Sequence, residues 1–240
     1  MTYQIEPIGH IQTPFTEKFG IPRQGIALSQ IPGKIVFNTP YDDMNAFRGI
    51  EAHSHLWIYF LFHANAASTE RFSPLVRPPR LGGNTKLGVF ATRSSFRPNN
   101  LGMTLVKRGE LVRQRQQTTL TVYGVDMLHR SPILDIKPYI PYADICPQAS
   151  SEFAPEAPAE ILQVHFSVAA QTHIKACQSM YPDLLGIIQT VLSQDPRPAF
   201  HSEAGFTANH PNKTYHIALY DKDVHFQVKD NVAEVIEITD

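Results

Sequence analysis

The stretch Arg71–Gly109 reads RFSPLVRPPRLGGNTKLGVFATRSSFRPNNLGMTLVKRG, with eight Lys or Arg residues and no Asp or Glu. Turn-forming Pro, Gly and Asn residues separate two short apolar runs, Leu87–Ala91 and Met103–Val106. This pattern predicts two strands alternating with loops that Pro and Gly hold rigid. A local excess of positive charge attracts polyanions, and phosphate contacts are its usual use. The alternative is a basic loop that is only solvated.

Residues 1–142, which include this stretch, contain many short apolar segments and little helical periodicity. Leu56–His63 is continuously apolar or aromatic and predicts a strand buried on both faces, whereas Tyr41–Gly49 predicts a helical turn. The other predicted strands are Tyr3–Ile11, Lys34–Asn38, Leu111–Val112, Thr118–Tyr123 and Ile133–Ile136. Closely spaced short strands predict a sandwich or barrel for residues 1–142.

Composition changes in residues 143–160, which are rich in Pro, Ala, Ser and acidic residues and predict a linker. Residues 161–240 predict a smaller α+β domain. Two helices are expected at Val168–Met180 and Leu184–Leu192. A three-stranded sheet is expected from three alternating segments, Thr214–Leu219, Val224–Val228 and Val232–Ile238.

The composition excludes several classes of protein. The chain has 240 residues and a net charge of −1, and no apolar run approaches the roughly 20 residues of a membrane span. The N-terminus lacks a secretory pattern, and Cys146 and Cys177 have no metal or disulfide spacing, which favours the cytoplasm. His53 and His55 would share one face of a strand, but a packing or binding role is preferred and no metal site is expected.

Two segments carry chemistry-bearing groups at close spacing. Thr92–Asn99 contains Arg93, Arg97 and an aromatic ring, which are the groups that single-stranded RNA recognition uses. Asp135–Tyr139 places Asp135 and Lys137 on one face of a strand, and the alternative is a surface ion pair of little energy. Neither a phosphate-binding loop nor a dinucleotide fingerprint is present, so a doubly wound nucleotide fold is disfavoured.

These motifs resemble those of the TrmO-type (TsaA-like, formerly YaeB-like) family over nearly the whole chain. The matching segments are Pro22–Gln24, Arg48–Glu51, Ser54–Trp57, Arg77–Asn84, Gly88–Ser94, Phe96–Asn99, Asp135–Tyr139 and Gln194–Pro198. The resemblance implies a small closed β-barrel domain that binds the methyl donor, a small α+β C-terminal domain, and a homodimer. It also implies methyl transfer from S-adenosyl-L-methionine to N6 of threonylcarbamoyladenosine at position 37 of threonine tRNA.

The same resemblance implies which residues bind the donor. They are Gln24, Gly25, Ile26, Ala27, His63, Ala64, Arg93, Met103, His129, Arg130, Ser131 and Pro132. The segment His129–Pro132 departs from the family pattern, which is usually Asp-Gly-Thr-Pro. Asn100 stands where the family usually has Pro.

Tyr139, Asp135 and Lys137 are the predicted catalytic residues, expected to orient the base or manage the N6 proton. Arginine forks suit phosphate and carboxylate groups. The predicted contacts to the tRNA anticodon stem-loop are Arg23, Arg77, Arg80, Arg97, Asn99, Arg197 and Tyr215.

Two alternatives remain open at this point. A non-catalytic RNA-binding β-barrel that has lost its donor site is suggested by His129 and Arg130. A small-molecule methyltransferase would be active without tRNA.

Overall fold

A computed structural model describes residues 3–22, 25, 30–68, 72–78, 85–152, 154, 162–197, 210 and 212–240. The chain divides into two compact units, which are described separately. Unit 1 comprises Met1–Thr13 and Arg23–Pro155, and unit 2 comprises Pro14–Pro22 and Glu156–Asp240. None of the helices in these described ranges is long and apolar enough to cross a membrane.

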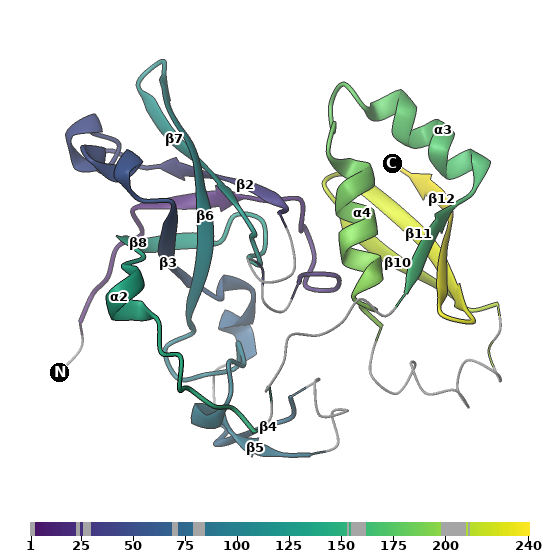
Figure 1. The fold of residues 1–240 in the computed structure, drawn as a ribbon, viewed down its shortest axis with the longest axis horizontal. Helices are drawn as coiled ribbons and strands as arrows, with labels where there is room; N and C mark the ends of the chain where they lie inside the picture. Colours follow the sequence, from purple (N-terminus) through teal and green to yellow (C-terminus); the bar gives the residue numbers. More distant parts are fainter. Residues whose placement is uncertain are drawn as a thin grey trace. The chain divides into compact units, whose positions relative to one another are not determined.

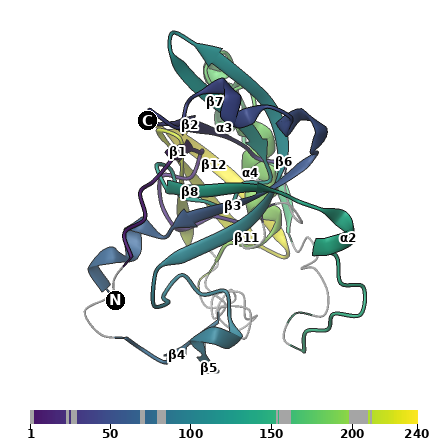
Figure 2. The same cartoon turned by 90° about the vertical axis from the view of Figure 1, so that its left-hand side faces the viewer.

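Unit 1 is built on a closed antiparallel barrel with the strand order β1-β2-β7-β6-β3-β8, and Figures 1 and 2 show it from two sides. The strands are β1 (Gly9–Gln12), β2 (Pro32–Phe37), β3 (His55–Leu61), β6 (Leu101–Gln114), β7 (Gln117–Tyr123) and β8 (Pro132–Pro138). Closure pairs every strand on both sides and removes the exposed edges that an open sheet presents. The barrel prediction is confirmed.

The barrel interior is filled by aliphatic side chains at alternate positions. Ile35, Ile58, Leu120 and Ile133 are all fully buried, as expected where successive side chains point to opposite faces of a strand. The prediction that β3 is buried on both faces was wrong, because its burial alternates between buried and half-buried positions. The outward side chains of β3 are therefore half-buried.

Strand lengths differ from the prediction at three places. The segments around Met103 and Leu111 belong to one 14-residue strand, β6, whose pairing with β7 is interrupted by a register shift between Arg108 and Leu111. Leu87–Ala91 is a two-residue strand, β5 (Leu87–Gly88), followed by the 3₁₀ turn η5 (Val89–Ala91). The first strand is confined to β1, because the residues from Tyr3 to Pro7 form no regular structure.

Short elements surround the barrel strands. β5 pairs with β4 (Leu75–Val76) in a hairpin that lies away from the barrel strands in both views (Figures 1 and 2). The 3₁₀ turns η1 (Met44–Phe47), η2 (Ile50–Ala52) and η3 (His63–Ser68) flank β3 in sequence, and α2 (Pro141–Asp144) follows β8.

Unit 2 is a four-stranded sheet in the order β10-β11-β12-β9. Its strands are β9 (Gln163–Phe166), β10 (Thr214–Leu219), β11 (Lys222–Lys229) and β12 (Val232–Thr239), and its helices are α3 (Val168–Cys177) and α4 (Leu184–Ser193). The prediction of three strands missed β9, which pairs in parallel with β12. β9 is short and only partly buried, so its pattern in the sequence is weak.

The segment Pro14–Pro22 is far from unit 2 in sequence but packs with it. Phe15 is fully buried and forms a β-bridge with Leu219. The backbone N–H of Tyr220 donates to the carbonyl of Pro14 at 2.7 Å. This segment is thus a part of unit 2, which the sequence pattern did not indicate.

Candidate functional site

One end of the barrel is formed where β3 ends and β6 begins. The Phe62 N–H donates to the carbonyl of Asn100 at 2.8 Å, and the chain then enters η3 at His63 and Ala64. The side-chain amide of Asn65 donates to the carbonyl of Ser95 at 2.9 Å. The loop of residues 92–100 is therefore fastened to η3, which brings the predicted residues His63, Ala64, Arg93 and Arg97 into one region.

The loop that carries Arg97 is held by its own polar groups. Nη1 of Arg97 lies 3.1 Å from the carbonyl of Thr92 and 3.4 Å from that of Ser94. The Thr92 and Ser94 hydroxyls accept from the N–H groups of Ser94 and Phe96, respectively. Part of the Arg97 guanidinium thus braces the loop, on which the Phe96 ring is 54 % exposed.

A half-buried carboxyl group with one fully buried oxygen lies at this end of the barrel. Asp126 follows β7 and accepts a 3.4 Å hydrogen bond from the Gly25 N–H through Oδ2. Burial raises the pKa of Asp126, although hydrogen bonds from the Thr104 side chain and Gly25 and the charge of Arg93 act in the opposite direction. Gly25 must be glycine in this arrangement, since a Cβ there would collide with the Gly124 carbonyl.

Two buried oxygens at this end are available for a ligand. Asp126 Oδ1 and Asn100 Oδ1 have no hydrogen-bond partner among the described residues. Buried polar atoms are rarely left without a partner, so each calls for a donor. The amino and hydroxyl groups of S-adenosyl-L-methionine are such donors. The residues present therefore fit this methyl donor.

The segment His129–Pro132, which departs from the family pattern, packs onto the end of β1. Nδ1 of His129 lies 3.1 Å from the carbonyl of Thr13, and the Arg130 N–H donates to the carbonyl of Ile11 at 2.7 Å. Ser131 is 2 % exposed, and its hydroxyl donates to the carbonyl of Leu128. Arg130 has a φ of 63°, a left-handed conformation that favours glycine. The glycine of the family pattern matches this backbone better than arginine does.

Of the predicted catalytic residues, Asp135 and Lys137 are exposed on β8, and Tyr139 directly follows its last residue. Nζ of Lys137 lies 3.0 Å from Asp135 Oδ2 and 5.6 Å from the centre of the Tyr59 ring. The hydrogen bond with Asp135 raises the pKa of Lys137, so its ammonium group persists. Tyr139 packs near Trp57, with ring centres 6.0 Å apart. The three side chains form one group around the aromatic residues of β3.

Tyr139 and the barrel end lie at opposite ends of β3. The Tyr139 N–H donates to the carbonyl of His55 at one end of β3, whereas His63 follows the other end. The eight residue steps from His55 to His63 span about 26 Å, whereas Asp135, the register partner of Tyr59, lies about 13 Å along β3 from His63. Met103, a predicted donor residue, pairs with Tyr59 and is 51 % exposed, between the two. One chain alone does not bring Tyr139 to the arginines of the loop.

The predicted RNA contacts fall in different places. Arg77 is exposed after β4, and Asn99 is exposed in the loop before β6. Arg197 is only 6 % exposed, forms two hydrogen bonds of 2.7 and 2.8 Å with Asp195, and lies 5.9 Å from the Tyr215 ring centre. An RNA contact by Arg197 stays a prediction. Five predicted site residues lie outside the described part of the chain: Arg23, Gln24, Ile26, Ala27 and Arg80.

Family models match both halves of the chain. The model of the tRNA-methyltransferase O N-terminal domain matches residues 10–145, and that of the TrmO C-terminal domain matches residues 159–240. The chain belongs to the TrmO family. A similar relative within the family is the tRNA (adenine(37)-N6)-methyltransferase of Escherichia coli (strain K12), 41% identical over 99% of this chain and 98% of the relative.

Further TrmO relatives agree in sequence and structure. A putative S-adenosylmethionine-dependent methyltransferase RcsF of Pseudomonas aeruginosa is 40% identical over 94% of this chain and 93% of the relative. The crystal structure of TrmO from Pseudomonas aeruginosa superposes with a TM-score of 0.80 at 31% identity, covering 100% of this chain and 99% of that one. The resemblance seen in the sequence is confirmed.

Sequence reasoning missed Asp126 as a candidate donor ligand. A signal was present, because an acidic residue directly follows the apolar run that ends in Gly124-Val125. Charged residues directly after a buried strand often lie at the open end of a sheet or barrel, where binding groups gather.

Proposed function

We propose that this protein is an S-adenosyl-L-methionine-dependent tRNA methyltransferase. Its substrate is N6 of threonylcarbamoyladenosine at position 37 of threonine tRNA. The observation that carries this proposal is the match of both halves of the chain to one methyltransferase family, with a relative aligned over 99% of the chain. The buried acceptors Asp126 and Asn100 at the barrel end support it.

The barrel end is the proposed donor site. When bound, S-adenosyl-L-methionine supplies an electrophilic methyl group. Asp126 and Asn100 offer acceptor oxygens for its amino or hydroxyl groups. Gly25 lets the backbone approach closely, and η3 with His63 and Ala64 forms the adjoining wall. The protein's contribution is to hold the methyl group in line with N6 and to exclude water.

The proposed acceptor chemistry uses the group on β8. N6 gains a methyl group and loses its proton, and the carbamoyl substituent makes that proton more acidic. Lys137 stays protonated beside Asp135 and serves as a donor. Asp135 is then the member of the group that accepts the proton, and Tyr139 orients the base. The half-buried aromatic side chains of Trp57, Tyr59 and Tyr139 on this face offer stacking surfaces.

The basic segment is the proposed contact surface for the anticodon stem-loop. Arg77 is exposed, and Arg93 and Arg97 lie on a loop stiffened by internal hydrogen bonds. Guanidinium groups held in this way suit phosphates and the threonyl carboxylate. Exposed Phe90 and Phe96 on the same segment suit unstacked bases.

We also propose that the active form is a homodimer in the cytoplasm. Tyr139 and the barrel end lie at opposite ends of β3 within one chain, so a second copy would bring a Tyr139 side chain beside the barrel end. Such sharing of a site across a twofold axis is common in symmetric dimers. Both cysteines, Cys146 and Cys177, are free thiols, which supports a reducing compartment.

The test is methyl transfer from labelled S-adenosyl-L-methionine to two threonine tRNAs, one carrying and one lacking the threonylcarbamoyl group. Label should enter only the modified tRNA, and Asp135→Asn should reduce the rate. Equal labelling of both tRNAs would contradict the substrate. Donor binding without any labelling would favour a different acceptor, and absence of donor binding would favour an RNA-binding protein without catalysis.

A further inference from the structure

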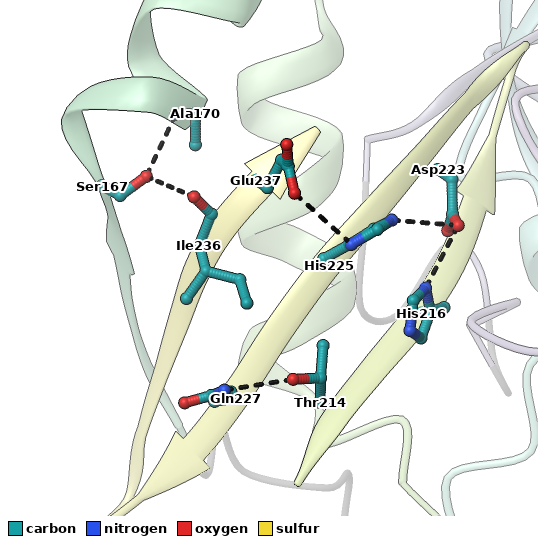
Figure 3. Close-up of polar contacts among 9 residues, drawn as sticks. All are labelled: Ser167, Ala170, Thr214, His216, Asp223, His225, Gln227, Ile236 and Glu237. Carbon is teal, nitrogen blue, oxygen red and sulfur yellow. Dashed lines mark hydrogen bonds and ion pairs between the residues drawn. The ribbon is translucent and has the colours of Figure 1, made fainter. Parts of the chain in front are cut away.

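Three side chains of metal-binding types meet on the outward face of the sheet in unit 2. His216 on β10 and His225 on β11 are direct register partners, with ring centres 4.2 Å apart. Asp223 precedes His225 by two residues and therefore points to the same face. Its Oδ2 lies 3.1 Å from His216 Nδ1 and 3.1 Å from His225 Nε2 (Figure 3).

We propose that His216, Asp223 and His225 form a binding site for one divalent transition-metal ion of the zinc class. The three ligand atoms lie within 4.8 Å of one another. Ligands about 2.0–2.1 Å from a tetrahedral zinc ion are about 3.3 Å apart. Two observed separations of 3.1 Å are close to that value, so the ion can enter with small side-chain movements. Water would complete the coordination.

The strands beneath the site are rigid. Val224 and Phe226, the neighbours of His225 in β11, are fully buried on the opposite face of the sheet. Ile217, which follows His216, is 1 % exposed. The register of β10 and β11 is thus fixed by the core of unit 2, which keeps the backbone positions of His216 and His225 opposite each other.

The surrounding charge favours a cation. Glu17, Asp221 and Asp240 line the same hollow as His216 and Asp223. The one lysine there, Lys222, lies 3.3 Å from Asp221 and 2.6 Å from Asp240, so its charge is already balanced. Four carboxylates, Glu17, Asp221, Asp223 and Asp240, therefore line the hollow with a single lysine, so its net charge is negative. The resulting potential draws cations to the imidazole pair.

A carboxylate outside the ligand set orients one imidazole. Glu237 on β12 is the register partner of His225, and its Oε2 lies 4.0 Å from His225 Nδ1. Metal-bound histidines usually direct their other ring N–H to a carboxylate or carbonyl. Glu237 therefore favours the tautomer that carries the proton on Nδ1 and leaves the Nε2 lone pair for the ion.

The position of Glu237 is itself fixed by the fold. The β11–β12 register shifts next to the His225–Glu237 pair, which leaves Ile236 as an extra residue on β12. The Ser167 hydroxyl donates to the Ile236 carbonyl at 2.7 Å and accepts from the Ala170 N–H at the start of α3 (Figure 3). Bulges of this kind re-aim a side chain beside functional sites.

The chemistry of the ligands selects the ion. Imidazole nitrogen suits Zn²⁺, Ni²⁺ and Cu²⁺, whereas Mg²⁺ and Ca²⁺ prefer shells of oxygen. An ion joining β10 and β11 also binds only the folded sheet, so it stabilises unit 2 by mass action. The competing interpretation is a hydrogen-bonded cluster without an ion, in which Asp223 accepts from both rings.

The test uses the full-length chain without an affinity tag, titrated with Zn²⁺ against a chromophoric chelator. One ion should bind per chain, and Mg²⁺ should not compete. His216→Asn and His225→Asn should each weaken binding at least tenfold, whereas His165→Asn, an exposed histidine of β9, should not. Zn²⁺ should raise the melting temperature of the unsubstituted chain by several degrees and leave the two site variants unchanged.

Circular dichroism and melting without metal establish that the variants are folded, and Asp223→Asn provides a second probe that leaves both rings in place. Cu²⁺ bound to the unsubstituted chain should show two nitrogen couplings by electron paramagnetic resonance. The proposal is overturned if the unsubstituted chain binds no ion, or if the site variants bind as tightly as the His165 variant.

Discussion

Replacing Asp126 with asparagine should change donor binding and stability in opposite directions. Oδ2 of this carboxyl accepts from Gly25, and the Thr104 side chain also hydrogen-bonds to the carboxyl group. Oδ1 is buried and has no hydrogen-bond partner among the described residues. An asparagine keeps the shape and must turn its carbonyl toward Gly25. Its NH₂ group then replaces Oδ1, so the group that faces the ligand becomes a donor instead of an acceptor.

The loss of affinity follows from the lost hydrogen bond. A hydrogen bond to a charged acceptor contributes about 1.5–3 kcal/mol. Asp126→Asn should therefore weaken binding of S-adenosyl-L-methionine by roughly ten- to 150-fold. The effect should be the same for the demethylated product, because Asp126 would contact parts of the molecule that the reaction leaves unchanged.

Stability should rise in the same variant. The folded protein holds a proton on Asp126 more tightly than the unfolded chain, since burial raises its pKa. At pH values above that raised pKa, the ionised carboxyl therefore lowers the free energy of unfolding. The decrease is about 1.4 kcal/mol for each pH unit by which the pKa is raised. The cost disappears as the pH falls through the raised pKa toward the ordinary value of 3.8, so the variant's advantage should vanish there.

Calorimetric titration with the donor and urea unfolding at several pH values measure both effects. Glu110→Gln is the matched control, because Glu110 is an exposed carboxyl on β6, six residues and about 20 Å of strand from Thr104. Unchanged donor affinity in Asp126→Asn would refute the assignment of Oδ1 to the ligand. A loss of stability at neutral pH would refute the claim that the ionised carboxyl is costly.

Two further predictions concern stability. Arg130→Gly should raise the unfolding free energy by roughly 0.5–1 kcal/mol relative to Arg130→Ala, because both remove the charge but only glycine relieves the left-handed backbone; equal melting temperatures for the two variants would contradict this. Asp195→Ala should destabilise the fold by roughly 3–5 kcal/mol, since Arg197 would remain buried without its carboxylate. The double change Asp195→Ala with Arg197→Met should recover much of that loss in urea unfolding, and no recovery would contradict the cause.

Much of the barrel could be predicted because its strands are short, apolar and bounded by turn residues. The strand around Ile58 and the hairpin around Leu120 follow from alternation and from polar residues between them. The double-sided burial expected for β3 failed because Trp57 and Tyr59 point outward although they are aromatic. An aromatic side chain on a functional surface looks the same in sequence as one in the core.

The spatial grouping of the site could not be predicted in the same way. The residues Asp135 to Tyr139 and the loop around Arg97 carry recognisable motifs, yet their separation along β3 depends on which strands pair and in which direction. Asn100 illustrates a local case. Its φ of 50° is incompatible with the proline that the family usually has there, because proline fixes φ at about −65°. The pattern of polar and apolar residues does not reveal such a backbone angle.

The most direct measurement of the central claim is mass analysis of the nucleosides from threonine tRNA after incubation with the protein and S-adenosyl-L-methionine. We expect threonylcarbamoyladenosine to be replaced by a nucleoside one methyl group heavier, with the added methyl on N6. If that nucleoside stays unmodified while the donor is bound, or if the methyl group is found on another base, this protein is not the proposed methyltransferase.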